Sequence, residues 1–203
     1  MQQLQDLMKR LSPYWLWLLL AVPALTMIAP VFGQDARALR GVLHGSGEFS
    51  ARFMIISMMA TPLMLLTKGS GFARWLRSNR RYFGVAAFCY ALVHAVAYLM
   101  SEPFARVLAE ATDFDILTGW LAFAIFIPLA ATSMDYAVRK MGTWWKGLQR
   151  WTYGAAVLTL LHWASLKDWG GWAPVAVHFG PLAALTLYRI WWTYLRARPL
   201  RTA

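Results

Sequence analysis

Residues 80–101 read RRYFGVAAFCYALVHAVAYLMS, and this stretch decides the fold. Two arginines are followed by a run, 82–101, that contains no charged side chain. Because a helix rises about 1.5 Å per residue, roughly 20 apolar residues cross the hydrocarbon core of a bilayer. His94 lies inside the run, where an ionisable side chain is costly and needs a reason. The stretch therefore predicts a membrane-spanning helix with a candidate functional residue.

Similar runs recur along the chain, which has 203 residues, 59% of them hydrophobic and 14% charged. We predict an all-α membrane protein, a six-transmembrane-helix bundle whose spans cover 13–32, 49–67, 82–101, 116–134, 148–166 and 170–192. Arg52, Arg150 and Lys167 near the span ends can extend their long side chains to the interface. Six spans use about 120 residues, which leaves no room for a soluble flavin or nucleotide domain. Residues 1–203 are therefore predicted to form one transmembrane domain.

Basic residues gather in alternate connections of the predicted bundle. They precede the first span and follow the second, fourth and sixth, as at Lys9, Arg10, Lys68, Arg74, Arg77, Arg80, Arg81, Arg139, Lys140, Lys146, Arg150, Arg196, Arg198 and Arg201. The connection 102–115 instead carries four acidic residues with only Arg106. By the positive-inside rule, both termini are predicted to be cytoplasmic. The net charge of +11 then reflects topology and contact with anionic membrane lipid, and no nucleic-acid partner is expected.

Two histidines lie at nearly the same predicted depth. His94 is twelve residues, about 18 Å, beyond Tyr82, and His162 is eleven residues, about 16 Å, beyond Trp151. Imidazoles at matched depth on two helices can bind a heme iron from its two faces. The same face of the third span carries small residues that leave room for a flat ring or a close helix, at Gly84, Ala87 and Ala91.

Other interpretations of these polar residues stay open at this point. His94 and His162 could be buried histidines that are bonded to backbone carbonyls or to each other. His178 is a rival ligand, because it lies nine residues into the last apolar run, at a similar depth. His44, before the second span, is a solvated loop histidine or a cofactor contact. Arg52 is predicted to contact either a heme propionate or lipid headgroups.

Several short motifs then point to a family. They are GEF at 47–49, TPL at 61–63, RRYFG at 80–84, LVH at 92–94, MG at 141–142 and LHW at 161–163. In this order the chain resembles the ferric reductase-like transmembrane family. It is most similar to the heme-binding membrane subunits of the periplasmic methionine sulfoxide reductase system. The resemblance covers roughly 44–166, whereas the two ends are generic spans.

The resemblance implies a b-type cytochrome in the bacterial inner membrane. Electrons would pass from the quinone pool, or from a cytoplasmic flavin reductase, to a periplasmic molybdenum-cofactor reductase. The family's axial histidines carry over to His94 and His162, which would bind the iron of heme b. Quinone and FMN are left open as further cofactors.

The implied role is that of an electron-transfer subunit of an oxidoreductase system. No residue is assigned a catalytic role, and whether the chain is itself an enzyme is left open. One alternative is a quinol-linked or ferric reductase-type cytochrome with a different partner. A non-redox membrane scaffold or a transporter is the other, although the acidic residues all lie at span edges or in connections.

The chain departs from the family pattern at the inner level of the bundle. Family members often have a histidine thirteen residues before the outer ligand on the fifth helix, where this chain has Gln149. The corresponding residue on the third helix is Arg81. Neither a guanidinium nor an amide is a usual heme ligand. We therefore predict one heme per chain.

Overall fold

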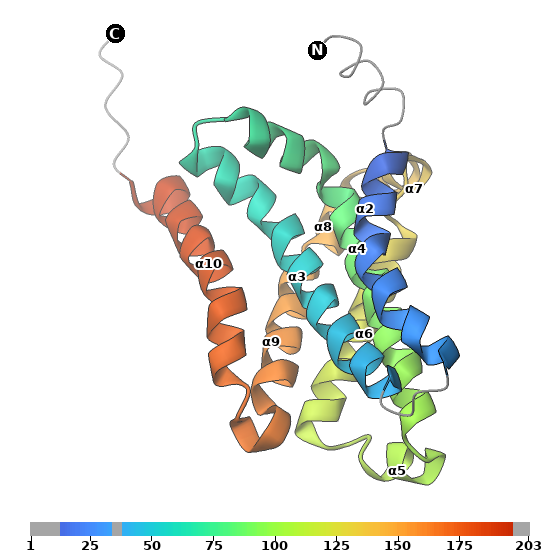
Figure 1. Cartoon of the computed structure of the whole chain (residues 1–203). Helices are drawn as coiled ribbons and strands as arrows, with labels where there is room; N and C mark the ends of the chain where they lie inside the picture. Colours follow the sequence, from blue (N-terminus) through green and yellow to red (C-terminus); the bar gives the residue numbers. More distant parts are fainter. Residues whose placement is uncertain (1–12, 34–37, 197–203) are drawn as a thin grey trace, which may run out of the picture.

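The computed structural model describes residues 13–33 and 38–196. Within these ranges every regular element is helical (Figure 1). Several residues on which the predicted topology rests lie outside the described residues: Lys9, Arg10, Arg198, Arg201 and the side chain of Lys167. The all-helical class expected from the sequence is confirmed for the described part of the chain.

In the described part of the chain, six long helices overlap the ranges of the six predicted spans. They are α2 (Tyr14–Ile28, continued by η1, Ala29–Gly33), α3 (Ala38–Leu66), α4 (Gly71–Ser101), α6 (Phe114–Ala131), α9 (Thr152–Trp169) and α10 (Trp172–Ile190, continued by η2, Trp191–Leu195). Short helices occupy the connections: α5 (Phe104–Ala109), α7 (Asp135–Met141) and α8 (Thr143–Gln149). By length and composition, four segments of residues 13–33 and 38–196 could cross a membrane, namely Tyr14–Phe32, Ala38–Leu66, Gly71–Ser101 and Phe114–Ala131.

Two helices begin well before the apolar runs that predicted them. α3 begins at Ala38 and α4 at Gly71, whereas the predicted spans begin at 49 and 82. The backbone hydrogen bonds of a helix do not depend on the polarity of its side chains, so a helix can continue beyond the end of an apolar run. The Ser70 hydroxyl accepts a hydrogen bond from the Ala73 N–H and caps the start of α4. His44, expected in a connection, is consequently an exposed residue of α3.

The long helices alternate in direction between the two ends of the molecule. α5 lies at one end and α7 at the other (Figure 1). Gly142 turns the chain sharply between α7 and α8 with a φ of 55°, a conformation that glycine adopts without strain.

Helix pairing places the residues that matter for the site. α3 packs most extensively on α4, and α6 on α9, while α10 covers α3 and α2 contacts both α3 and α4. Tyr90 fastens α2 to α4, because its hydroxyl donates to the Leu20 carbonyl at 2.8 Å and accepts from the Ala24 N–H at 2.7 Å. The hydroxyl thus replaces a backbone hydrogen bond of α2 next to Pro23, where a proline disturbs the helix.

Candidate functional site

His94 reaches from α4 to the beginning of α3. Its Nδ1 lies 2.8 Å from the Leu43 carbonyl oxygen and donates a hydrogen bond to it. A proton on Nδ1 leaves the Nε2 lone pair available, which is the state in which an imidazole binds a metal. Gly47 permits this approach, because a Cβ at that position would lie 2.8 Å from His94 Nδ1.

His162 is held in the same way by the second helix pair. Its Nδ1 lies 2.7 Å from the Asp115 carbonyl oxygen of α6. A Cβ at Gly119 would lie 2.9 Å from His162 Nδ1. In both pairs the acceptor carbonyl and the glycine are four residues apart, so they lie one turn apart on one helix face.

The two imidazoles come together between the helix pairs. Their ring centroids are 6.1 Å apart and their planes are inclined by 80°. Two metal–imidazole bonds of about 2 Å, with about 1 Å from each nitrogen to its ring centre, give roughly 6 Å between centroids. Among the described residues no group of three His, Cys, Asp or Glu side chains could hold a metal ion. Two imidazoles alone suit an iron whose other ligands come from a macrocycle.

Gly47 lies in the motif at 47–49, but neither Gly47 nor Gly119 was predicted to position a histidine, because the small residues predicted there lie on the histidine's own helix. Those residues have a different place. Gly84 and Ala87 line a cavity of about 630 Å³, and a Cβ at Gly84 would be 3.6 Å from the Ser57 Oγ. A glycine within an apolar helix, opposite a mid-helix histidine, would have been the signal to look for.

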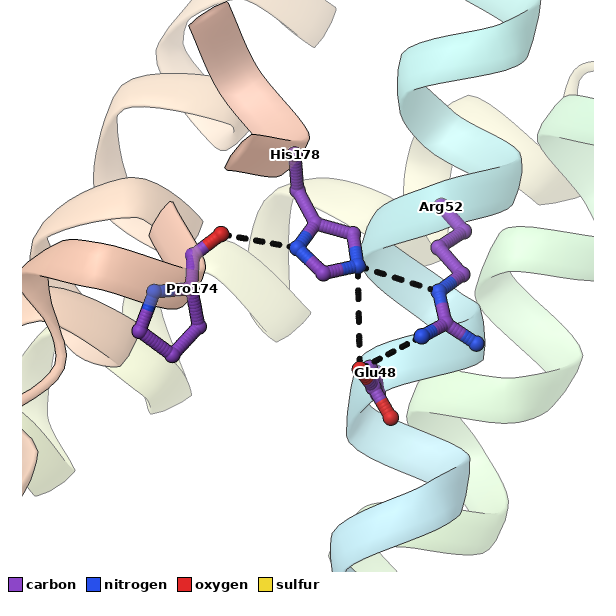
Figure 2. Close-up of polar contacts among 4 residues, drawn as sticks. All are labelled: Glu48, Arg52, Pro174 and His178. Carbon is purple, nitrogen blue, oxygen red and sulfur yellow. Dashed lines mark hydrogen bonds and ion pairs between the residues drawn. The ribbon is translucent and has the colours of Figure 1, made fainter. Parts of the chain in front are cut away.

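His178 lies in a separate polar cluster that joins α10 to α3 (Figure 2). Its Nδ1 donates to the Pro174 carbonyl oxygen at 2.7 Å, and its Nε2 accepts from Arg52 Nε at 3.2 Å. Arg52 Nη2 also pairs with Glu48 Oε1 at 2.5 Å, and this carboxylate lies 3.6 Å from His178 Nε2. Among the described residues, both nitrogens of His178 have protein partners, whereas only the Nδ1 atoms of His94 and His162 do.

Of the two remaining predicted site residues, one is exposed and the other is bonded to neighbouring side chains. His44 is exposed on α3, whereas Arg52 is partly buried by its cluster and lies over the Phe49 ring at 5.0 Å. Glu48, which connects Arg52 with His178, was not predicted as a site residue. The sequence places it in the motif at 47–49 and, like the other acidic residues, at a span edge or in a connection.

At the inner level, the two residues that replace the family's histidines have other partners. Arg81 Nη1 pairs with Asp135 Oδ1 at 2.5 Å. This hydrogen bond and the positive charge of Arg81 lower the pKa of the Asp135 carboxyl. Gln149 Nε2 donates to the Leu129 carbonyl at 3.2 Å and to Thr132 Oγ1 at 3.3 Å.

Comparison with known proteins gives consistent matches. The family described as ferric reductase like transmembrane component matches residues 46–160, a region that contains His94 and ends two residues before His162. The chain is 33% identical over 193 residues to the protein-methionine-sulfoxide reductase heme-binding subunit MsrQ of Brucella ovis, which covers 90% of this chain and 84% of that relative.

Two further relatives carry the same description. The MsrQ of Brucella canis is 33% identical over 193 residues, with the same coverage of 90% and 84%. That of Brucella anthropi is 33% identical over 152 residues, or 72% of this chain and 66% of the relative. No solved structure matches the chain. Together with the apolar helices, these similarities indicate a multi-pass membrane protein.

Proposed function

The chain belongs to the ferric reductase-like transmembrane family, and from this premise we propose that it is a heme-binding electron-transfer subunit of a methionine sulfoxide reductase system. The observation that carries the proposal is the pair formed by His94 and His162. Each ring donates from Nδ1 to a backbone carbonyl, and the ring centroids lie 6.1 Å apart. A heme held there would take up one electron at its iron and pass it on.

The proposed cofactor is heme b, with His94 and His162 as the axial ligands of its iron. The Nδ1 hydrogen bonds fix the tautomer and orientation of both rings and raise their basicity. Covalent attachment through a pair of cysteines does not apply, since the sequence contains one cysteine. The partners of His178 argue against that residue as a ligand. Arg52 and His44 stay secondary candidates for cofactor contacts, Arg52 with a propionate.

We propose one heme per chain. At the inner level, Arg81 is paired with Asp135, and Gln149 donates to Leu129 and Thr132. A guanidinium has no lone pair for iron, and an amide oxygen is a weak ligand.

The proposed arrangement in the membrane is a six-span bundle formed by one domain, 1–203, with both termini in the cytoplasm of a bacterium and the bundle in its inner membrane. The helices α9 and α10 would supply the fifth and sixth spans. This orientation places α5, with Arg106 between Glu102 and Glu110, on the periplasmic side. His94 and His162 then lie toward the periplasm, on the side of an acceptor there.

The proposed acceptor is a periplasmic molybdenum-cofactor enzyme that reduces methionine sulfoxide, and the donor is quinol or a cytoplasmic flavin reductase. The similarity to the Brucella relatives supports a methionine sulfoxide reductase as the partner, because those relatives are described as heme-binding subunits of such a reductase. FMN and quinone are proposed only as candidate electron carriers on the donor side of the heme. A ferric reductase-type cytochrome with another partner would share the same heme site.

The test is to purify the full chain and record its absorption spectrum. We expect a Soret band. His94→Ala and His162→Ala should each remove most of the heme, because each variant loses one of the two proposed axial ligands. His178→Ala is the control and should keep a normal spectrum. Loss of heme in His178→Ala with retention in His94→Ala would overturn the ligand assignment. A colourless protein would contradict the proposed heme and favour a non-redox membrane scaffold or a transporter.

A further inference from the structure

A second site lies at the end of the bundle near α8. Its cavity of about 630 Å³ is walled by α3, α4, α6, α8, α9 and α10. This volume lies within the range of roughly 300–1,000 Å³ that is typical of small-ligand sites. Neither His94 nor His162 lines the cavity. Its lining residue nearest to His94 along α4 is Ala87, about 10 Å earlier by helical rise.

The cavity has a strongly positive lining. Among the residues that the structure describes, the lining contains no acidic side chain and six basic ones: Arg77, Arg80, Arg81, Lys146, Arg150 and Arg189. In the described part of the chain, Arg81 is the one member of this set with an ion pair. Like charges that the fold brings together from α4, α8 and α10 repel one another, so an anion in the cavity would relieve the repulsion.

The hydrogen bonds of Arg80 and Arg189 do not neutralise their positive charges. Arg80 Nη1 donates to Thr61 Oγ1 at 3.3 Å, and Arg189 Nη1 donates to the Tyr153 hydroxyl at 2.9 Å. Both acceptors are neutral. Guanidinium groups with neutral partners retain their preference for phosphate oxygens, which they bind with two parallel hydrogen bonds.

The floor of the cavity is apolar. It is formed by Met54, Ala87, Phe126 and Leu129, which are 1%, 1%, 6% and 6% exposed. Along α4 the lining runs from Arg77 to Ala87, ten residues or about 15 Å. A ligand that satisfies both parts therefore has an anionic head at one level and an apolar body that extends into the bundle.

We propose that this cavity binds an anionic phospholipid, with its phosphate held by Arg77, Arg80, Arg150 and Arg189 and an acyl chain against Met54 and Phe126. Basic pockets between membrane helices on the cytoplasmic side bind anionic lipid headgroups. A soluble phosphate without an apolar body, such as glycerol phosphate, would leave the apolar floor without a partner. The site goes beyond the proposed electron transfer and shares no ligand with the histidine pair. Because Arg81 and Gln149 line it, it rests on the proposal of one heme per chain.

The experiment uses the full chain, purified in mild detergent and then delipidated. Native mass spectrometry counts bound lipid during titration with phosphatidylglycerol, phosphatidylcholine or glycerol phosphate. We expect one tightly held phosphatidylglycerol per chain. The double variant Arg80→Gln with Arg150→Gln should bind it at least about tenfold more weakly, because two charged hydrogen-bond donors are lost.

A matched double variant removes the same charge elsewhere. Arg139→Gln with Lys140→Gln, both on α7 and outside the cavity lining, should bind like the unaltered chain. Gly84→Leu tests the floor separately, since the longer side chain enters the cavity while every positive charge remains. It should also lose the lipid, with helix content by circular dichroism unchanged.

Three results would overturn the proposal. One is equal binding by the cavity variant and its α7 control. Another is binding of glycerol phosphate as tight as that of phosphatidylglycerol, which would assign the site to a soluble phosphate. The third is equal binding of phosphatidylcholine. Since the readout is bound lipid, His94→Ala should leave it unchanged, which separates this test from that of the heme.

Discussion

Each histidine of the pair depends on a glycine of the neighbouring helix. A side chain at position 47 or 119 would occupy the space of the imidazole, as a Cβ there would lie 2.8 Å or 2.9 Å from Nδ1. Such distances are shorter than van der Waals contact, so the ring would have to move. The two glycines thus position the rings, although neither is itself a candidate ligand.

Gly47→Ala and Gly119→Ala should therefore each weaken heme retention. Displacement of the ring breaks the Nδ1 hydrogen bond, and loss of such an outer partner costs about 10-fold to 100-fold in metal affinity. Heme content and the electron paramagnetic resonance spectrum of the ferric protein measure the effect. Gly41→Ala is the control on α3, because its Cβ would meet nothing within 4 Å. Unchanged spectra in both glycine variants would contradict a positioning role.

The number of hemes is also decided by single residues. Since Arg81 and Gln149 offer no strong ligand, a pyridine hemochrome assay should give close to one heme per chain. Gln149→Ala should not change this value, because the amide donates to Leu129 and Thr132 and is a weak ligand for iron. Two hemes per chain, with one lost in Gln149→Ala or Arg81→Ala, would show that this pair binds iron.

At the scale of the helices, α10 is attached to α3 by the cluster of Glu48, Arg52 and His178 (Figure 2). The His178 ring also packs at a tilt of 42° against Trp163 of α9, with 4.9 Å between ring centroids, so it contacts a third helix. Polar contacts between helices stabilise helix packing in a membrane. Apolar side chains gain little free energy there by exchanging lipid tails for protein neighbours.

His178→Leu should loosen α10 without removing heme. The lost hydrogen bond to Arg52 leaves a guanidinium with one fewer partner, and the expected destabilisation is about 1 kcal/mol. The thermal midpoint in detergent, followed by circular dichroism, should fall while the Soret band stays. Val177→Ala is the neighbouring control, because Val177 is 71% exposed. A midpoint equal to that of the control would show that the cluster does not fasten α10.

At the scale of the whole molecule, the distribution of charge predicts orientation. Reporter fusions after Ser78 and after Gly142 should be cytoplasmic, and one near Ala109 should be periplasmic. The first two sites lie among the basic residues of α4, α7 and α8, and the third follows Arg106, which pairs with Glu102 and Glu110. A periplasmic signal after Ser78 would reverse the proposed topology.

Much of this protein could be predicted from its sequence because the signals are local. The length of the run 82–101 and the helical rise suffice to predict a span and to estimate the depth of His94. The same reasoning predicts the depth of His162. The motifs at 47–49, 80–84 and 92–94 also predicted the family that the comparisons confirm.

Only the tertiary structure decided which side chains meet. The acceptor of His94 is 51 residues away at Leu43, and that of His162 is 47 residues away at Asp115. Arg52 and His178, which are joined by a hydrogen bond, are separated by 126 residues in the sequence. Periodicity and hydropathy describe single helices, whereas these contacts depend on which helices pack and how each is rotated. The glycine contacts of the histidine pair and the basic cavity between α4, α8 and α10 exist only after that packing.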